Sequence, residues 1–465
     1  MEPLFTNDAV ILGLLLIVLA AIFYTSSIKK GFWAKFYTYV PALLLCYFVP
    51  ALLNWPLGWI APHWYDAGLL DALRQMNVQL PSDILSMSYD QVNSWLDDQG
   101  LQKADFSAYA HHSHLYFMAS RYLLPAALIL LCLGIDFKGF INLGPKAIIM
   151  FFAATAGIIL GGPIALYLII EFAPGLIDNS SPDEVWRGLS TVAGSWIGGG
   201  ANQTAMKEIY EVSDRIFASM IVVDVVVANI WMAFLLYGAN VAEKVDRWLK
   251  ADTSAIESLK KKVEDYQDSI KVNPSTTQLF VLFGVGFGGV ALAHWGADVI
   301  TPFISQWKEQ LDSLRLNSLM SGFFWLIVIS TTVGLVISFT PYRSIEGYGA
   351  SKFGSIFIYI LVATIGMKMN LGDVFSNLGL FAIGIIWMLV HVLILLVVGK
   401  LIKAPLFYVA VGSQANVGGA ASAPIVASAF SPTLAPVGVL MAVLGYAMGT
   451  YGAIICAMLM QSIAT

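Results

Sequence analysis

Charged residues are scarce in this sequence. Asp, Glu, Lys and Arg make up 12% of the 465 residues, roughly half of their share in a typical soluble domain, whereas hydrophobic residues make up 58%. Apolar runs of about 17 to 25 residues, the length needed to cross a bilayer, recur along the whole chain. These features exclude an ordinary soluble protein and predict an all-α polytopic membrane protein.

Cysteines and catalytic motifs are scarce as well. The three cysteines, Cys46, Cys132 and Cys456, lie in apolar runs and show neither a disulfide framework nor the spacing of metal ligands. The segment from Ser195 to Gly199 lacks the strand and the His/Asp partner of a nucleophile elbow. No basic region precedes the first apolar run, so we expect a retained span and not a signal peptide. We therefore predict no enzyme, no metal site, no cofactor apart from a coupling ion, and no nucleic-acid partner.

Two glycine-rich stretches interrupt the apolar pattern, one from Gly194 to Met206 and one from Gly412 to Ser422. Consecutive glycines weaken a helix, and lipid offers no hydrogen-bond partner to the amide side chains beside them. Broken apolar segments at corresponding positions of two halves indicate the binding site of a transporter. The residues that we expect to contact the solute are Ser195, Gly199, Gly200, Asn202, Gln203, Thr204, Ser413, Gln414, Asn416, Gly418 and Gly419.

The chain is expected to consist of two similar halves, residues 1–237 and 276–465, each with five transmembrane helices and one broken segment before the last helix. An acidic insertion, about 54–113, contains amphipathic pieces at about 66–76 and 82–96, and we expect it to be a cap or a dimer contact and not an independent domain. The linker 238–275 is expected to contain an amphipathic helix at about 256–270. Expected spans are about 9–24, 36–53, 115–135, 147–170, 216–237, 279–295, 319–340, 353–369, 378–398 and 435–460, and the broken segments are 186–210 and 406–430. Three spacings of small residues, Gly157-xxx-Gly161, Gly284-xxx-Gly288 and Gly445-xxx-Gly449, predict close helix packing.

The distribution of Lys and Arg decides whether the broken segments cross the membrane, because basic residues gather in cytoplasmic loops. If each broken segment is a re-entrant hairpin, 16 of the 25 basic residues fall in inner loops. They are Lys29, Lys30, Lys35, Lys138, Lys146, Lys244, Arg247, Lys250, Lys260, Lys261, Lys262, Lys271, Arg343, Lys352, Lys400 and Lys403. If all twelve segments crossed, the basic linker would lie outside. The charges therefore favour two inverted repeats in the inner cell membrane, with both termini extracytoplasmic, and we expect a homodimer.

The two glycine-rich stretches, the turn from Leu143 to Ala147 and the run from Asp224 to Trp231 look like the YjcL-like family of uncharacterised membrane proteins. That family is grouped with cation:proton antiporters and anion transporters. The resemblance covers most of the chain outside the two polar insertions. It implies a scaffold and a core of the elevator type, similar to glutamate and citrate carriers, but supplies no substrate. Unlike those carriers, neither stretch has a pure glycine cluster, and no Arg follows the second stretch.

Asp224 is the only carboxylate well inside a predicted span, where it costs several kcal/mol unless it is paired or protonated. It can bind a coupling Na⁺, carry a proton or face the amine of a solute; alternatively, it makes a structural hydrogen bond to a helix break. Asn229, about 140° further round the same helix, is a second candidate for ion coupling. His391 and His294 are expected to be hydrogen-bonded structural residues.

The leading hypothesis is a secondary active transporter of a small polar or anionic organic solute, coupled to Na⁺ or H⁺. The lack of an intramembrane Arg or Lys disfavours a multivalent anion, whereas helix ends and amides suit an amino acid, a short peptide or a monocarboxylate. The alternative is a cation:proton antiporter that uses Asp224 as the ion or proton carrier.

Overall fold

The computed structural model describes residues 2–28, 30–40, 42–76, 78–81, 84, 87, 89–177, 181–251, 274–313, 317–369, 379–431 and 434–464. It divides into two compact units, unit 1 (Met1–Arg121 and Tyr359–Leu371) and unit 2 (Tyr122–Ile358 and Gly372–Thr465). Within the described residues, seven helices are long and apolar enough to cross a membrane, or eight if one bent pair counts as a single span. The prediction of a helical, multi-pass membrane protein is confirmed.

Three of the ten expected spans differ from a single long helix. The second is divided into two helices, and Val40 between them is extended, as is usual for a residue before proline. At the end of the seventh (319–340), the helix that begins at Gly322 gives way, with a bend of 104°, to a 3₁₀ helix that begins at Pro341. The helix at the eighth (353–369), Ala350–Gly366, has only 17 residues. The expected amphipathic helix at 256–270 lies outside the described residues.

Unit 1 contains the acidic insertion, which has a small hydrophobic core that its composition did not indicate. Pairs of apolar residues one helical turn apart, Leu69 with Leu73 and Val92 with Leu96, are fully buried in it. The strands β1 and β2 pair antiparallel beside this core, with His63 opposite His112. The elements of unit 1 are α1 (Asp8–Ser27), α2 (Gly31–Tyr39), α3 (Ala42–Asn54), β1 (His63–Tyr65), α4 (Gly68–Gln75), α5 (Tyr89–Asp98), η2 (Lys103–Tyr109), β2 (Ala110–His112) and α6 (Leu115–Met118). The π-helical turn η3 (Ala119–Leu123) and α18 (Ala350–Gly366) cross the boundary between the units.

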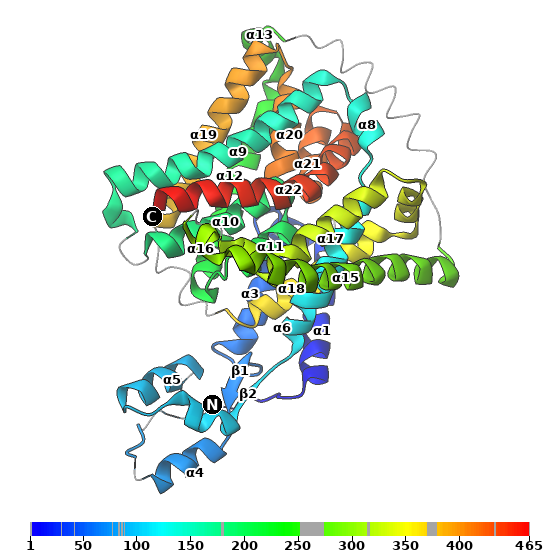
Figure 1. Ribbon diagram of the computed structural model, residues 1–465. Helices are drawn as coiled ribbons and strands as arrows, with labels where there is room; N and C mark the ends of the chain where they lie inside the picture. Colours follow the sequence, from blue (N-terminus) through cyan, green and yellow to red (C-terminus); the bar gives the residue numbers. More distant parts are fainter. Residues whose placement is uncertain are drawn as a thin grey trace. The chain divides into compact units, whose positions relative to one another are not determined.

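Unit 2 consists of two packed groups of helices (Figure 1). We call the first the hairpin bundle: α9 (Pro145–Phe172), α10 (Pro182–Gly198), α11 (Gly200–Ile209), α12 (Asp214–Asn240), α19 (Gly379–Leu401), α20 (Leu406–Val417), α21 (Gly419–Phe430) and α22 (Ala435–Ala464). We call the second the support bundle: α7 (Leu124–Leu133), α15 (Thr276–Ile304) and α17 (Gly322–Ser338). Shorter elements connect them: α8 (Phe137–Asn142), η4 (Pro174–Leu176), α13 (Ala242–Leu249), η5 (Ser305–Trp307), α16 (Lys308–Ser313), η6 (Asn317–Met320) and η7 (Pro341–Tyr348).

Two of the three predicted small-residue spacings are used for close packing. A methyl group added at Gly161 on α9 would lie 2.6 Å from the ring of Trp387 on α19, and Gly445-xxx-Gly449 packs against the first hairpin. By contrast, no described atom lies within 4 Å of where a methyl group would stand at Gly284 or Gly288 on α15. Of the three spacings, the first and the third therefore take part in close helix packing among the described residues, and the second does not.

Hydroxyl groups join the two bundles along α17 and α22. The Thr331 and Thr450 hydroxyls are 3.1 Å apart, and the Thr332 hydroxyl is 2.7 Å from that of Tyr451. The two α17 hydroxyls also reach carbonyls one turn back in their own helix, Thr331 at 2.9 Å and Thr332 at 2.6 Å. We call this line of contacts the hydroxyl seam.

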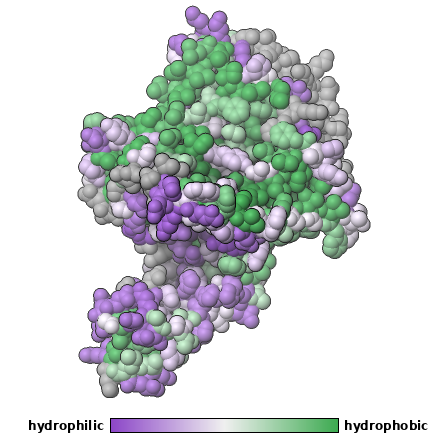
Figure 2. Space-filling model, viewed as in Figure 1, coloured by the Kyte–Doolittle hydropathy of each residue, from purple (hydrophilic) through white to green (hydrophobic). Residues whose placement is uncertain are grey.

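Hydrophobic residues form much of the surface of unit 2. Figure 2 shows hydrophobic residues over its helices, whereas hydrophilic residues gather on the insertion of unit 1. Large side chains such as Phe280 and Leu401 are 75% and 76% exposed. Side chains of this kind on long helices are those expected to face lipid.

Candidate functional site

The first broken segment is a helical hairpin, which we call hairpin 1. Its first arm, α10, begins at a capping box in which the Ser181 hydroxyl accepts from the Glu184 N–H and the Glu184 carboxylate accepts from the Ser181 N–H. The arm ends at Gly199, whose φ of +79° favours glycine, and the second arm, α11, follows at once. The expected break at the three glycines is therefore present.

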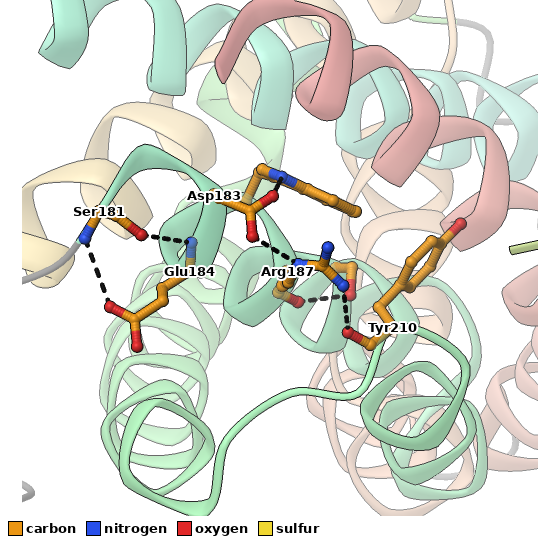
Figure 3. Close-up of polar contacts among 7 residues, drawn as sticks. Ser181, Asp183, Glu184, Arg187 and Tyr210 are labelled. Carbon is orange, nitrogen blue, oxygen red and sulfur yellow. Dashed lines mark hydrogen bonds and ion pairs between the residues drawn. The ribbon is translucent and has the colours of Figure 1, made fainter. Parts of the chain in front are cut away.

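A polar staple closes the base of hairpin 1 (Figure 3). Arg187 donates from Nε to the Asp183 carboxylate at 2.9 Å and from Nη1 to the carbonyl of Tyr210 at 2.9 Å. Trp186 donates to the same carboxylate at 2.9 Å. Since Tyr210 follows the last residue of α11, Arg187 joins the beginning of one arm to the end of the other.

Replacing Arg187 by Met is expected to loosen this base without disturbing the tip. The side chain is 35% exposed, so its ion pair contributes little, and the lost bond to the Tyr210 carbonyl costs about 1 kcal/mol. A melting temperature in detergent that falls by a few degrees would agree with this. Arg74→Met is the matched control, since its ion pair with Asp71 is exposed and should be dispensable. Complete unfolding of Arg187→Met would contradict the assignment.

The second broken segment is also a hairpin, hairpin 2. Its arms α20 and α21 meet at Gly418 and at Gly419, whose φ is +58°. The arms fold back on each other, because the rings of Phe407 and Phe430, near the far ends of the two arms, are 5.6 Å apart. The Asp246 carboxylate of α13 accepts from the N–H of Leu406 at 2.7 Å and so caps the first turn of α20. Burial raises the pKa of Asp246, and this N–H partly opposes the effect.

Both hairpin tips reach one glycine of α22. A methyl group at Gly445 would lie 2.7 Å from the carbonyl oxygen of Ile197 in hairpin 1 and 3.5 Å from that of Ala415 in hairpin 2. One turn further on, a methyl group at Gly449 would lie 2.5 Å from the Cα atom of Gly198. The two hairpins therefore approach each other, near their helix breaks, at this glycine of α22.

Asn202 and Asn416 play the same chemical part in the two hairpins. Asn202 donates to the carbonyl of Gly198 at 3.0 Å and to that of Tyr446 at 3.0 Å, and its oxygen accepts from Thr450 at 2.6 Å. Asn416 donates to the carbonyls of Gly412 at 3.0 Å and Phe151 at 3.3 Å, and its oxygen accepts from Thr155 at 2.8 Å. In each hairpin the amide bonds a carbonyl four residues back and a neighbouring helix. Both N–H donors of each amide are thus occupied by the protein itself.

Asp224 lies on α12 and accepts three hydrogen bonds from hairpin 1. The donors are the Ser195 hydroxyl at 2.6 Å, the Trp196 indole at 2.7 Å and the Gln203 amide at 2.9 Å. The Asp224 residue is 5% exposed, and no cationic side chain among the described residues pairs with it. Asp224 therefore joins the two arms of hairpin 1 to α12 through neutral donors.

A second buried junction holds hairpin 2. His391 on α19 places Nδ1 3.1 Å from the carbonyl of Ala154 and Nε2 2.8 Å from the Ser413 hydroxyl. A carbonyl can only accept, so Nδ1 carries the proton and Ser413 donates to Nε2. The Ser413 oxygen in turn accepts from the indole of Trp231 on α12, at 2.8 Å. The structure thus agrees with a structural, hydrogen-bonded role for His391, and α12 anchors both hairpins.

Some of the remaining expected site residues bond only to their own helix, and others keep a backbone or side-chain group available for a solute. Thr204 bonds carbonyls of its own helix, and Asn229 donates to the Val225 carbonyl of its own helix at 2.7 Å. A methyl group at Gly199 would lie 4.0 Å from the ring of Tyr446 and one at Gly200 3.9 Å from the Ile358 side chain, so neither position is tightly packed. Gln414 is 1% exposed and donates to Ser422 at 2.6 Å, while its carbonyl oxygen has no partner among the described residues.

Sequence reasoning did not identify several residues of this network. Trp196 and Trp231 look like ordinary apolar helix residues, and Thr155 lies among alanines. Their indole and hydroxyl groups become visible as candidates only when the rotation of each helix is known. Lys207, which is absent from the basic residues predicted for inner loops, is 5% exposed and lies 2.9 Å from Asp214, so it is nearly buried near the end of α11.

Two comparisons with known proteins bear on the family of this chain. A protein-family model described as "Protein of unknown function (DUF819)" matches residues 106–463, a range that includes both hairpins and Asp224. A relative described as "Uncharacterized membrane protein YjcL", from Bacillus subtilis (strain 168), is 24% identical over 342 residues, which are 73% of this chain and 82% of the relative. The resemblance predicted from the two glycine-rich stretches is confirmed. The chain belongs to the DUF819 family of proteins of unknown function.

Proposed function

We propose that this protein is a secondary active transporter of a small polar or anionic organic solute, such as an amino acid, a short peptide or a monocarboxylate. The observation that carries the proposal is the meeting of both helix breaks at Gly445 of α22. Broken helices leave backbone groups unpaired, which is costly in lipid and is tolerated where the break is buried or lines a cavity. Paired breaks of this kind mark the solute sites of transporters.

Transport by alternating access, coupled to Na⁺ or H⁺, follows from the same proposal. The order of a long helix, a hairpin and a long helix occurs in both halves, as α9 to α12 and as α19 to α22. This order supports two repeats of the same build. We propose that the repeats are inverted, that they lie in the inner membrane with extracytoplasmic termini, and that the hairpin bundle moves in the elevator manner. The homodimer belongs to the same proposal.

The hydrogen bonds indicate which groups are left for a solute. Asn202, Asn416 and Ser413 are engaged within the protein, so we assign them to shaping the tips. Contact with the solute is assigned to the backbone at Gly199, Gly200, Gly418 and Gly419, to the N-terminal turns of α11 and α21, and to the free oxygen of Gln414. An anionic group suits the helix N-termini. An ammonium, amide or hydroxyl group suits the Gln414 oxygen.

Replacing Gln414 by Met tests this assignment. The change keeps the side chain long but removes the oxygen that has no partner among the described residues. Uptake should fall at least about tenfold, because a lost hydrogen bond to the solute of about 1.4 kcal/mol corresponds to a factor of ten in affinity. The free energy of unfolding without solute should change by no more than about 1 kcal/mol, because only the bond to Ser422 is lost. Asn416→Leu is the matched contrast, since it breaks three bonds and should lower stability clearly. Unchanged uptake by Gln414→Met would remove Gln414 from the site.

A cation:proton antiporter is the second candidate function. It is favoured by Asp224, a buried carboxylate held by neutral donors and without a cationic partner among the described residues. Proteoliposomes distinguish the two candidates. Dissipation of a pH gradient by Na⁺ or K⁺ in the absence of any organic solute would favour the antiporter.

A thermal-shift screen of candidate solutes, with and without Na⁺, is the direct test of the leading function. A solute that binds only the folded protein raises its melting temperature, and a coupling ion should enlarge that shift. Solutes that pass the screen are then tested for uptake into proteoliposomes. A protein that is active neither in uptake nor in cation:proton exchange would contradict both candidates.

A further inference from the structure

Four of the six histidines of this chain gather in the insertion of unit 1, at positions 63, 111, 112 and 114. The sequence predicted no metal site, because no pair of His, Cys or acidic residues shows the spacing of zinc ligands, and His63 is far from the other three histidines along the chain. The pairing of β1 with β2 removes that separation, since His63 lies directly opposite His112. The rings of His112 and His114 are 4.5 Å apart, and those of His63 and His112 are 6.1 Å apart.

The cluster borders an open pocket of about 480 Å³. Its lining residues are Thr6, Asn7, Asp8, Trp64, Ala110, His111, His112 and His114. Three histidines and one aspartate thus line the same pocket, and His112 and His114 are exposed. Exposed side chains can rotate toward an ion at little cost in packing.

Two carboxylates are hydrogen-bonded beside these histidines. The Asp8 carboxylate accepts from the Ser113 hydroxyl at 2.6 Å and from the His114 N–H at 3.0 Å, which fixes it beside the histidines. The Asp66 carboxylate lies 2.8 Å from Nε2 of His111, leaving the other ring nitrogen of that histidine for a further contact. Metal-binding imidazoles and carboxylates are commonly oriented by such bonds.

We infer that this pocket binds one divalent transition-metal ion, with His112, His114 and Asp8 as protein ligands. Two imidazole nitrogens and one carboxylate form a donor set that suits Zn²⁺, Cu²⁺ or Ni²⁺ and is poorly suited to Mg²⁺ or Ca²⁺. Among the described residues no three potential ligands stand together as a group that could already hold an ion, so binding requires the exposed side chains of His112 and His114 to rotate toward it. The remaining coordination positions stay open to water or to a second molecule.

The position of the ligands gives the ion a structural consequence. Asp8 lies in the first turn of α1, whereas His112 and His114 precede α6. A bound ion would therefore join the beginnings of two helices that are distant in sequence, within unit 1. This inference is independent of the proposed transport function.

The test is Zn²⁺ titration of the full-length protein in detergent by calorimetry, with the melting temperature as a second readout. We expect saturable binding of about one Zn²⁺ per chain and a rise in melting temperature. His112→Ala and His114→Ala should each weaken binding at least about tenfold, since even outer-shell losses cost this much. His294→Ala, on α15 and outside the pocket, should bind as the parent does.

Electron paramagnetic resonance with Cu²⁺ adds a readout that does not depend on stability. Two coordinated nitrogens should be seen in the parent protein and one in either single variant. Circular dichroism and gel filtration check that the variants are folded. The absence of saturable binding by the parent, or unchanged binding by the His112→Ala/His114→Ala double variant, would overturn the inference.

Discussion

Asp224→Asn is expected to abolish ion-coupled transport and to destabilise hairpin 1. Three donors converge on the Asp224 carboxylate, whereas an amide offers a single acceptor oxygen and turns an NH₂ group toward at least one of these donors. Hydrogen bonds to a charged group contribute about 1.5–3 kcal/mol each to stability. The variant loses at least one of them and buries its new NH₂ group against another donor, so the free energy of unfolding should fall by about 3 kcal/mol or more. The measurements are uptake into proteoliposomes and thermal unfolding in detergent.

Controls separate the ionic role of Asp224 from its role as an acceptor. Asn229→Ala lies on the same helix and removes only a bond to its own backbone, so both readouts should stay near the parent values. Ser195→Ala and Trp196→Phe each remove one donor and keep the carboxylate. They should lower stability by about 1.5–3 kcal/mol while ion dependence remains. If Asp224→Asn keeps full ion-dependent transport, the carboxylate is an anchor for hairpin 1 and does not couple the ion.

Gly449→Ala is expected to separate hairpin 1 from α22. The new methyl group would lie 2.5 Å from the Cα atom of Gly198 and 2.5 Å from the side-chain nitrogen Nδ2 of Asn202. Neither neighbour is the flexible end of a long side chain, so the backbone of one element has to move. Overpacking of this kind costs about 1–3 kcal/mol, and loss of the Asn202 bonds to Tyr446 and Thr450 adds to it. Melting temperature and solute binding should both fall.

Gly284→Ala is the matched control, because it also alters a Gly-xxx-Gly spacing within a long apolar helix. No described atom lies within 4 Å of where its methyl group would stand, so stability should be unchanged or slightly higher, as for Gly to Ala in a helix. If Gly449→Ala melts at the same temperature as Gly284→Ala, α22 and hairpin 1 are not packed as closely as the structure indicates.

The sequence was sufficient to predict the two helix breaks and their place before the last span of each half. Glycine has a local effect on the backbone, so Gly199 and Gly418 stand out without knowledge of the fold. The apolar spans are readable for a similar reason, since lipid imposes a minimum length on each helix. The family resemblance rested on the same local features.

The partners of the polar side chains could not be predicted from the sequence. We expected Asn202 and Asn416 to contact a solute, but each is hydrogen-bonded to a carbonyl in its own hairpin and to a neighbouring helix. Which helix face meets which depends on rotation and crossing angle, which hydrophobic periodicity does not fix when a helix is apolar all round. The strands of the insertion were missed because three residues each are too short to establish an alternating pattern.

Parting α17 from α22 would leave few hydrogen bonds unmade. Thr331 and Thr332 already reach carbonyls of their own helix, and Thr450 already donates to Asn202. Only the Tyr451 hydroxyl gives up its partner, and it does so at an exposed contact. The hydroxyl seam thus sets a preferred register between the two bundles. A shift of α17 along α22 would leave few polar groups without a hydrogen bond, so its cost in desolvation is small. Any resistance to sliding would come from side-chain shape and not from polar adhesion.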